Sequence, residues 1–275
     1  MDFFVKTPER TSTPLVVEVP HAGLAVDPES LSSLIAPSCS LGRDADLYVD
    51  ELFQDAADLG AALLVSRLSR YVIDLNRGES DVDALSADGG EARATPHGLI
   101  WRMTTEGQPA IAHPISRSEL ERRLASFYRP YHATLASLLH ERRERFGYAI
   151  LLCAHSMPSR GRTGHRDAGR PRADVVPGSR GRTTAAARVI DELDLVAREA
   201  GFSVAHDDPY RGGYSTGHYG NPSQGVHAVQ IEIGRNRYMD ERTLAKLPKN
   251  FAEMREFCRV LTRRLASLRL PRSEA

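Results

Sequence analysis

The sequence has few cysteines and no long apolar run. Cys39, Cys153 and Cys258 are scattered along 275 residues, and with no CxxC pair they predict neither a disulfide framework nor a cysteine-rich zinc site. No apolar stretch approaches the roughly 20 residues that cross a bilayer, and residues 1–10 lack the apolar core of a secretion signal. These absences predict a cytoplasmic protein with no membrane partner.

Neither sign of charge is in excess. Lys and Arg total 36, as do Asp and Glu, so the chain lacks the basic surplus typical of nucleic-acid-binding proteins. The arginine-rich stretch at 160–182 is interpreted as a solvated loop. The GxSxG, GxxxxGK[ST], GxGxxG and HExxH signatures are also absent. The sequence therefore favours a small-molecule partner, and it specifies no oligomeric state.

Short apolar runs alternate with helical patterns along the chain. The apolar runs predict strands at 15–19, 62–66, 71–75, 149–154, 202–204 and 228–233. Periodic apolar residues predict helices at 46–61, 116–146, 184–200 and 251–268, the second of them kinked at Pro130. This alternation predicts an α/β fold with a mostly parallel or mixed sheet. No repeat or domain boundary is visible, so residues 1–275 are expected to form a single domain.

Two segments, 78–98 and 159–182, are rich in Gly, Ser, Asp or Arg and show no periodicity. Connections of this length in a compact domain are often functional.

Reactive side chains follow three of the predicted strands. His21 comes after strand 15–19, Asn76 and Arg77 after strand 71–75, and His155 after strand 149–154. Because ligands of open α/β sheets bind beyond the carboxyl ends of the strands, we expect these side chains to converge on one site.

His21 and His155 are the candidate metal ligands. Imidazole suits zinc, and a catalytic zinc site keeps three protein ligands and one open position. Asp44 or Asp46, the nearest acidic pair after His21, would supply the third ligand. Each residue has a structural alternative: a hydrogen-bonded histidine, or an aspartate that caps a helix.

Glu232 lies on the polar side of the alternating strand 228–233. A buried carboxylate there would suit a general base acting on water, and the alternative is a salt bridge to Arg235 or Arg237. Arg70, Asn76 and Arg77 flank strand 71–75, and a guanidinium binds a carboxylate through two parallel hydrogen bonds. For the arginines, the alternatives are a surface position or pairing with Asp74.

The turn-rich stretch 208–214 carries Tyr210, Arg211 and Tyr214 among glycines that allow close approach to a ligand. Ordinary turns have the same composition. His132, in the long helical pattern, is expected to be a core or capping histidine. Cys153, in an apolar run, is expected to pack as a small hydrophobic side chain.

Seven segments together carry a family resemblance. In order they are VEVPHAG (17–23), RDADLYVDELF (43–53), SRYVIDLNR (69–77), RPYH (129–132), LLCAHSMPSR (151–160), DPYRGGY (208–214) and HYGNPSQGVHAVQIEIGRNRYMDE (218–241). The combination resembles the N-formylglutamate amidohydrolases, a family related to zinc carboxypeptidases and aspartoacylases. The resemblance implies a zinc-carboxypeptidase-like (phosphorylase/hydrolase-like) fold, with a mixed sheet flanked by helices on both sides.

The resemblance also implies roles for particular residues. It makes His21, His155 and one of the aspartates, with Asp46 favoured over Asp44, the ligands of one Zn²⁺ ion. Glu232 would be the general base.

The resemblance further implies a substrate-binding set. Arg70 and Arg77 would polarise the carbonyl or bind substrate carboxylates, Asn76 would assist them, and Tyr210, Arg211 and Tyr214 would close the pocket.

The expected reaction is hydrolysis of N-formyl-L-glutamate to formate and L-glutamate, in histidine degradation. Two alternatives stay open. One is an amidohydrolase or carboxypeptidase-like enzyme acting on another N-acyl amino acid or a small peptide. The other is a non-catalytic module that binds a carboxylate ligand.

Overall fold

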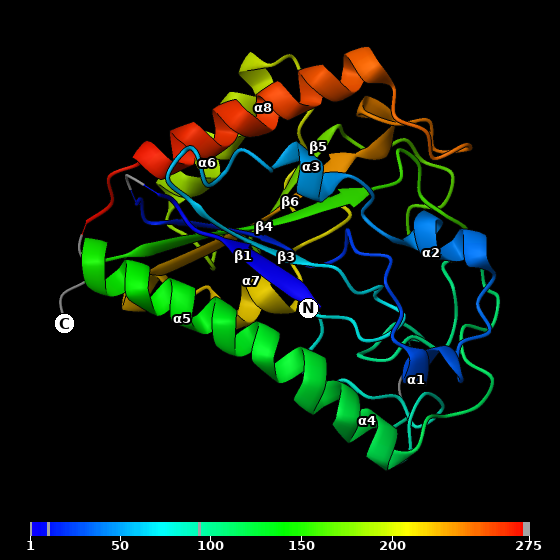
Figure 1. Cartoon of the computed structure of the whole chain (residues 1–275). Coiled ribbons are helices and arrows are strands. Elements are labelled where there is room, and N and C mark those ends of the chain that lie inside the picture. The colour runs from blue at the N-terminus through cyan, green and yellow to red at the C-terminus, as the bar shows by residue number, and fades with distance from the viewer. Residues whose placement is uncertain (1, 10–11, 93–94, 272–275) are drawn as a thin grey trace. The chain divides into compact units, whose positions relative to one another are not determined.

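The computed structural model describes residues 2–9, 12–92 and 95–271 (Figure 1). Within these ranges the strands are β1 (Phe3–Lys6), β2 (Leu15–Val19), β3 (Ala62–Ser66), β4 (Ala149–Met157), β5 (Val175–Gly178) and β6 (Val226–Gly234). The α-helices are α1 (Pro28–Leu31), α2 (Ser38–Asp44), α3 (Val49–Leu52), α4 (Arg117–Arg123), α5 (Arg129–Phe146), α6 (Ala187–Glu199), α7 (Tyr214–Tyr219) and α8 (Pro248–Ser267). None of the helices in these ranges is long and apolar enough to span a membrane.

The strands form one six-stranded sheet in the order β1-β3-β2-β4-β6-β5. Strand β4 pairs in parallel with both β2 and β6, whereas β5 runs antiparallel to β6 at the edge. All nine residues of β4 are buried, as expected of a parallel strand covered on both faces. The predicted α/β class with a mixed, mostly parallel sheet is confirmed; a kinship with zinc carboxypeptidases stays a prediction.

The chain divides into two compact units. Unit 1 comprises Met1–Phe4, Pro20–Leu47 and Val65–Thr134, and unit 2 comprises Val5–Val19, Tyr48–Leu64 and Leu135–Ala275.

Unit 2 holds most of the sheet. Figure 1 shows α6 and α8 on one side of its strands and α7 on the other. Helix α6 buries Val189, Ile190 and Leu193 at helical spacing, and burial of each such side chain stabilises the fold by roughly 1.5–3 kcal/mol.

Unit 1 is mostly irregular and is held by specific polar contacts. Ser116 caps α4 by accepting a hydrogen bond from the Glu119 backbone N–H. The loop that carries His21 lies against the backbone of Arg67, where a Cβ on Gly23 would come within 2.1 Å of the Arg67 carbonyl carbon. Only glycine fits there, so Gly23 sets the position of that loop.

The helix predicted at 46–61 is wrong beyond one turn. Only Val49–Leu52 is helical, and the backbone then proceeds to Gly60 through a series of turns. Tyr48 has a φ of 68°, which no helix interior accepts. The backbone N–H of Asp46 bonds to the carbonyl of His21 instead of a helical acceptor.

The strand predicted at 71–75 is also wrong, although all five residues are buried. Its backbone groups bond to Leu99, Arg123 and His132 rather than to a neighbouring strand. Buried backbone groups need partners of some kind, and here side chains and a loop supply them. The apolar run therefore predicted the burial of residues 71–75 correctly, but not their backbone conformation.

The remaining predictions differ mainly in their bounds. Residues 117–146 are helical throughout, and the π-helical turn Leu124–Tyr128 lies two residues before Pro130, whose missing N–H interrupts the ladder. Strand β5 lies inside the segment predicted to be irregular. Segment 202–204 forms only an isolated bridge between Val204 and Val175.

Helix α6 ends in a glycine cap, at which the effect of backbone strain on stability can be measured without a steric clash. Gly201 has a φ of 79°, and the N–H groups of Gly201 and Phe202 donate to the carbonyls of Arg198 and Ala197, a Schellman motif. No atom lies within 4 Å of a Cβ added there. Gly201→Ala should therefore lower the free energy of unfolding by about 1–2 kcal/mol through backbone strain alone.

Urea unfolding at one temperature measures this change. Gly201→Asn is the control, because asparagine tolerates the left-handed region and should cost less than alanine. An alanine variant as stable as the parent chain would contradict the strain argument.

Candidate metal centre and active site

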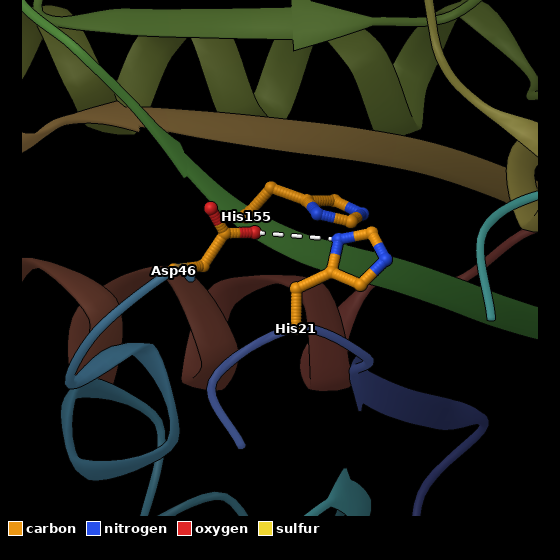
Figure 2. A group of neighbouring side chains, drawn as sticks. All are labelled: His21, Asp46 and His155. Carbon is orange, nitrogen blue, oxygen red and sulfur yellow. Dashed lines mark ion pairs between the residues drawn. The ribbon is translucent and has the colours of Figure 1, made fainter. Parts of the chain in front are cut away.

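Three buried side chains far apart in the sequence come together. His21 follows β2, Asp46 follows α2, and His155 lies near the end of β4. One ligand atom from each lies within 4.8 Å of the other two, and all three residues are buried. Figure 2 shows the Asp46 carboxylate directed toward the imidazole of His21, with the His155 ring beside them. This group could hold a metal ion.

The donor geometry fits a shared ion. Nδ1 of His21 and Oδ2 of Asp46 are 3.6 Å apart, which is long for a hydrogen bond. Two donors that each lie about 2.0–2.2 Å from one tetrahedral ion are separated by about 3.4 Å. Two imidazoles and one carboxylate also match the ligand set of an open mononuclear site.

Asp74 fixes the ring of His21. Its Oδ1 lies 2.8 Å from Nε2 of His21, so Nδ1 is the nitrogen that faces Asp46. Metal-ligating histidines are commonly oriented in this way by a carboxylate on the other ring nitrogen. Asp74 also accepts hydrogen bonds from Arg70 and from the Trp101 indole. It therefore organises the part of the site that unit 1 carries.

Burial alone would raise the pKa of Asp74, but the opposing effect of His21 and Arg70 holds it well below its ordinary value. The sequence reasoning considered Asp74 only as a partner for arginine. An acidic residue inside the apolar run 71–75 was the signal that could have identified it.

Asp44 has other partners. Its carboxylate accepts hydrogen bonds from the Tyr71 hydroxyl and from the side chain and backbone N–H of Thr105. Asp44 ends α2, so it is not an N-cap. Of the two aspartates, the structure brings Asp46 to the histidines.

Arg70 and Arg77 are both held in unit 1. Nη2 of Arg70 lies 2.9 Å from Asp74, and its guanidinium stacks over the Trp101 ring at 4.3 Å. Arg77 donates to the backbone carbonyls of His97 and Asn76. Neither arginine is a loosely held surface side chain, and both are partly buried.

His97, which the sequence reasoning did not single out, packs against Trp101 with ring centroids 4.4 Å apart. Burial, assisted by Arg70 and Arg77, lowers its pKa and favours the neutral ring. Asn76 is 4% exposed, and its backbone N–H bonds to Asp74.

Glu232 is the register neighbour of His155. The two residues are Cα partners on the parallel strands β6 and β4, so their side chains project to the same face of the sheet. Glu232 is 6% exposed and accepts a 2.8 Å hydrogen bond from the side-chain amide of Gln230.

The two arginines considered as salt-bridge partners of Glu232 have contacts of their own. Arg237 pairs with Asp174. Arg235 donates from Nε to the hydroxyl of Ser156.

The loop before α7 lies near Glu232. Tyr210 is part-buried, and burial together with the charge of Glu232 raises the pKa of its hydroxyl. Tyr214 begins α7 and stacks on His218, whereas Arg211 is exposed.

The arginine-rich loop is only partly solvated. The side chain of Arg172 is 2% exposed, pairs with Asp167 and lies over the Tyr210 ring at 5.2 Å. One arginine of the stretch thus supports Tyr210, while Arg160, Arg166 and Arg170 are exposed.

Two further predictions concern core residues. His132 is 9% exposed and bonds to the Leu75 carbonyl, which confirms a core histidine. Cys153 is fully buried, as expected of a small apolar side chain, but it contacts the Thr216 hydroxyl, and burial beside Glu18 raises its thiol pKa well above the usual value. All three cysteines are free.

Fold and site together define an α/β protein that can hold a metal ion through two imidazoles and one carboxylate. Residues 13–239 match the family model described as N-formylglutamate amidohydrolase. The chain therefore belongs to the N-formylglutamate amidohydrolase family, and the predicted resemblance is confirmed.

Similar proteins agree with this assignment. The chain is 36% identical over 231 residues to an N-formylglutamate deformylase of Pseudomonas putida, covering 83% of this chain and 82% of that protein. It is 34% identical over 237 residues to the N-formylglutamate deformylase of Pseudomonas aeruginosa, covering 85% of each. Relatives with these names make the chain an enzyme of the amidohydrolase type.

Solved structures show the same architecture. The crystal structure of N-formylglutamate amidohydrolase from Ralstonia eutropha matches with a TM-score of 0.86 and 30% identity, over 96% of this chain and 97% of that one. A gene product of Agrobacterium tumefaciens matches with a TM-score of 0.70 at 17% identity, over 97% and 95% of the two chains, which shows a shared fold alone.

Metal content tests the donor set directly. The parent chain should retain about one divalent ion, and His21→Ala and His155→Ala should each reduce this to a small fraction because the ion loses a ligand. Elemental analysis after dialysis measures the content.

His140→Ala is the matched control, since the His140 side chain is 65% exposed on α5, and its metal content should equal that of the parent. Full metal content in both ligand variants would overturn the assignment.

Proposed function

We propose that this enzyme hydrolyses the amide bond of N-formyl-L-glutamate with one Zn²⁺ ion and releases formate and L-glutamate, in histidine degradation. The observation that carries the proposal is the buried His21, Asp46 and His155 group with Glu232 in register beside His155. The names of the Pseudomonas relatives support the substrate.

Zinc is the ion that this donor set favours, since imidazole nitrogen and carboxylate oxygen are its usual ligands in three-ligand catalytic sites. When bound, it would lower the pKa of a coordinated water toward about 7 and polarise the formyl carbonyl. His21 and His155 would act as neutral donors, and Asp74 would hold His21 in the required tautomer.

Glu232 acts as the general base in this proposal. It takes a proton from the attacking water, and later donates that proton to the amine that leaves as glutamate. Its position on the rigid strand β6, rather than on a loop, fixes the face of the sheet to which its side chain projects. The register with His155 supports this role because it keeps Glu232 on the face where His155 contributes its ring.

Arg70, Arg77 and Asn76 orient the substrate. A substrate with two carboxylates needs more than one cationic partner, and a guanidinium can bind a carboxylate through parallel hydrogen bonds. Arg70 or Arg77 also stabilises the developing oxyanion. Tyr210 and Arg211, on the loop before α7, and Tyr214, the first residue of that helix, close the pocket over the bound substrate.

Replacement of the base should separate chemistry from binding. Glu232→Gln should lower kcat by about 10²–10⁴-fold, the range that general base catalysis contributes, with metal content unchanged. Formate release measures kcat.

Glu253→Gln on α8 is the control, since the Glu253 side chain is 62% exposed and the same chemical change there should leave kcat at the parent value. Parent-like activity in Glu232→Gln would remove Glu232 from the mechanism.

A substrate panel tests the reaction itself. N-formylglutamate should have the highest kcat/KM. The kcat/KM of N-formylnorvaline, which lacks the side-chain carboxylate, should be lower by about 10–100-fold, the value of about one charge-assisted hydrogen bond. A chelator should abolish turnover, and added Zn²⁺ should restore it.

A higher kcat/KM for an N-acetyl amino acid or a dipeptide would favour the broader amidohydrolase alternative. Binding of glutamate without turnover of any substrate would favour the carboxylate-binding module.

A further inference from the structure

The side chain of Gln230 connects Glu232 to the loop before α7. Its Nε2 donates to Oε1 of Glu232 at 2.8 Å, and its Oε1 accepts from the backbone N–H of Gly213 at 2.8 Å. We infer that Gln230 is a positioning residue that orients the Glu232 carboxylate through a hydrogen bond whose direction Gly213 sets. The inference rests on the proposed role of Glu232 as general base.

The direction of the amide follows from chemistry. A backbone N–H can only donate, so the atom of Gln230 that faces Gly213 must be the carbonyl oxygen. The amide nitrogen then faces Glu232, where it meets an oxygen that accepts. A rotated amide would bring its NH₂ group against the Gly213 N–H and its oxygen against the carboxylate. The arrangement therefore has one favourable orientation.

Both partners of Gln230 are held in place. Gln230 is 4% exposed on β6 and has register partners on both sides, Cys153 on β4 and Gly178 on β5. A Cβ at Gly178 would lie 2.6 Å from the backbone nitrogen of Gly212. Because position 178 is glycine, the loop can lie directly on the sheet and present the Gly213 N–H to Gln230.

Helix α7 has a second attachment to the same sheet. The Ser215 hydroxyl donates to the buried carboxylate of Glu18 at 2.9 Å. Glu18 on β2 is the register partner of Cys153 on β4. This attachment fixes the first turn of α7, next to Gly213, without using Gln230. It therefore offers a control that perturbs the helix but not the contact to Glu232.

The hydrogen bond from Gln230 gives the buried carboxylate of Glu232 a defined direction. A general base must reach the water at hydrogen-bond distance, and small misplacements of a reacting group reduce rates by large factors. Without the amide, Oε1 of Glu232 loses this donor, and the direction of the carboxylate is less tightly fixed. Metal ligands and substrate-binding arginines are untouched, so the loss should fall on kcat rather than on KM.

Gln230→Met tests the inference, because methionine has a similar length but neither hydrogen-bonding group. We expect kcat for formate release to fall by about 10–100-fold with KM changed by less than about 3-fold, the pattern of an interaction made in the chemical step. Metal content and the thermal unfolding midpoint report whether the variant is folded and loaded. Ser215→Ala should keep the parent kcat.

A double-mutant cycle distinguishes positioning from a merely structural role. If Gln230 acts through Glu232, then Gln230→Met should change kcat by less than about 2-fold in the Glu232→Gln background. An equal loss in both backgrounds would overturn the inference, as would an unchanged kcat in the single variant. Gln230→Asn, too short to span Gly213 and Glu232, should behave like methionine if the latter fails to fold.

The two proposals fail in different ways. A parent-like Gln230→Met beside an inactive Glu232→Gln would remove only the positioning role. A parent-like Glu232→Gln would remove the general base and, with it, the role of Gln230.

Discussion

The hydrogen bond between Asp74 and His21 is the constraint on which the metal-binding geometry of unit 1 depends. An imidazole can present either nitrogen to an ion, and the 2.8 Å contact on Nε2 leaves Nδ1 directed at Asp46. Asp74 is itself fully buried, which would be costly for an isolated charge. The guanidinium of Arg70 and the indole of Trp101 compensate it.

This arrangement links two roles that are usually described separately. Arg70 is proposed to stabilise the oxyanion or bind substrate carboxylate, yet its Nε and Nη2 both bond to Asp74. The same carboxylate therefore orients a candidate metal ligand and a proposed substrate-binding group. Because the contacts share one residue, their energies are coupled and cannot be assigned to separate pairs.

Unit 2 contributes its groups by a different principle, the register of a parallel sheet. His155 and Glu232 belong to strands paired residue by residue from Ala149 to Met157, so a slip by one position would turn one of them to the opposite face. The apolar residues of β4 and β6 secure that register, because both faces of these strands are buried. Packing of the core thus determines where the proposed base lies relative to a candidate metal ligand.

The metal-ligand candidates could be predicted from position alone. His21 and His155 stood at the ends of apolar runs, and the ends of parallel strands meet at one edge of a sheet. The acidic side chain inside the apolar run 71–75 marks Asp74 as unusual, but neither its contacts nor those of Gln230 could be assigned in the same way. Their importance comes from partners such as Trp101 and Gly213 that are distant in sequence, and no local pattern encodes those contacts.

The errors in the predicted elements have a common origin. Residues 71–75 form an apolar run, and such a run indicates burial whether or not the backbone is extended. In 46–61 the helical periodicity was real, but Tyr48 has a positive φ value, so the helix begins only at Val49, and it ends at Leu52 before a series of turns that runs to Gly60. In both cases backbone groups bond across unit 1 or in turns, where tertiary contacts outweigh local propensity. These irregular segments carry Asp46 and Asp74, and Arg70 directly precedes the second of them.

The polar face of the sheet in unit 2 shows how such a site can remain stable. Glu18, Gln230 and Glu232 project where apolar residues would give more burial energy, and each buried polar group is destabilising unless it is hydrogen-bonded. Ser215 and Gly213 provide such bonds to Glu18 and Gln230 from the segment that begins α7. Hydrogen bonds require a particular distance and direction, whereas apolar contacts do not. A helix that donates to buried polar groups is therefore expected to occupy one defined position on the sheet. Each donor serves its own acceptor, Ser215 for Glu18 and Gly213 for Gln230, so it is the bond from Gly213 that ties the loop with Tyr210 and Arg211 to the geometry of Glu232.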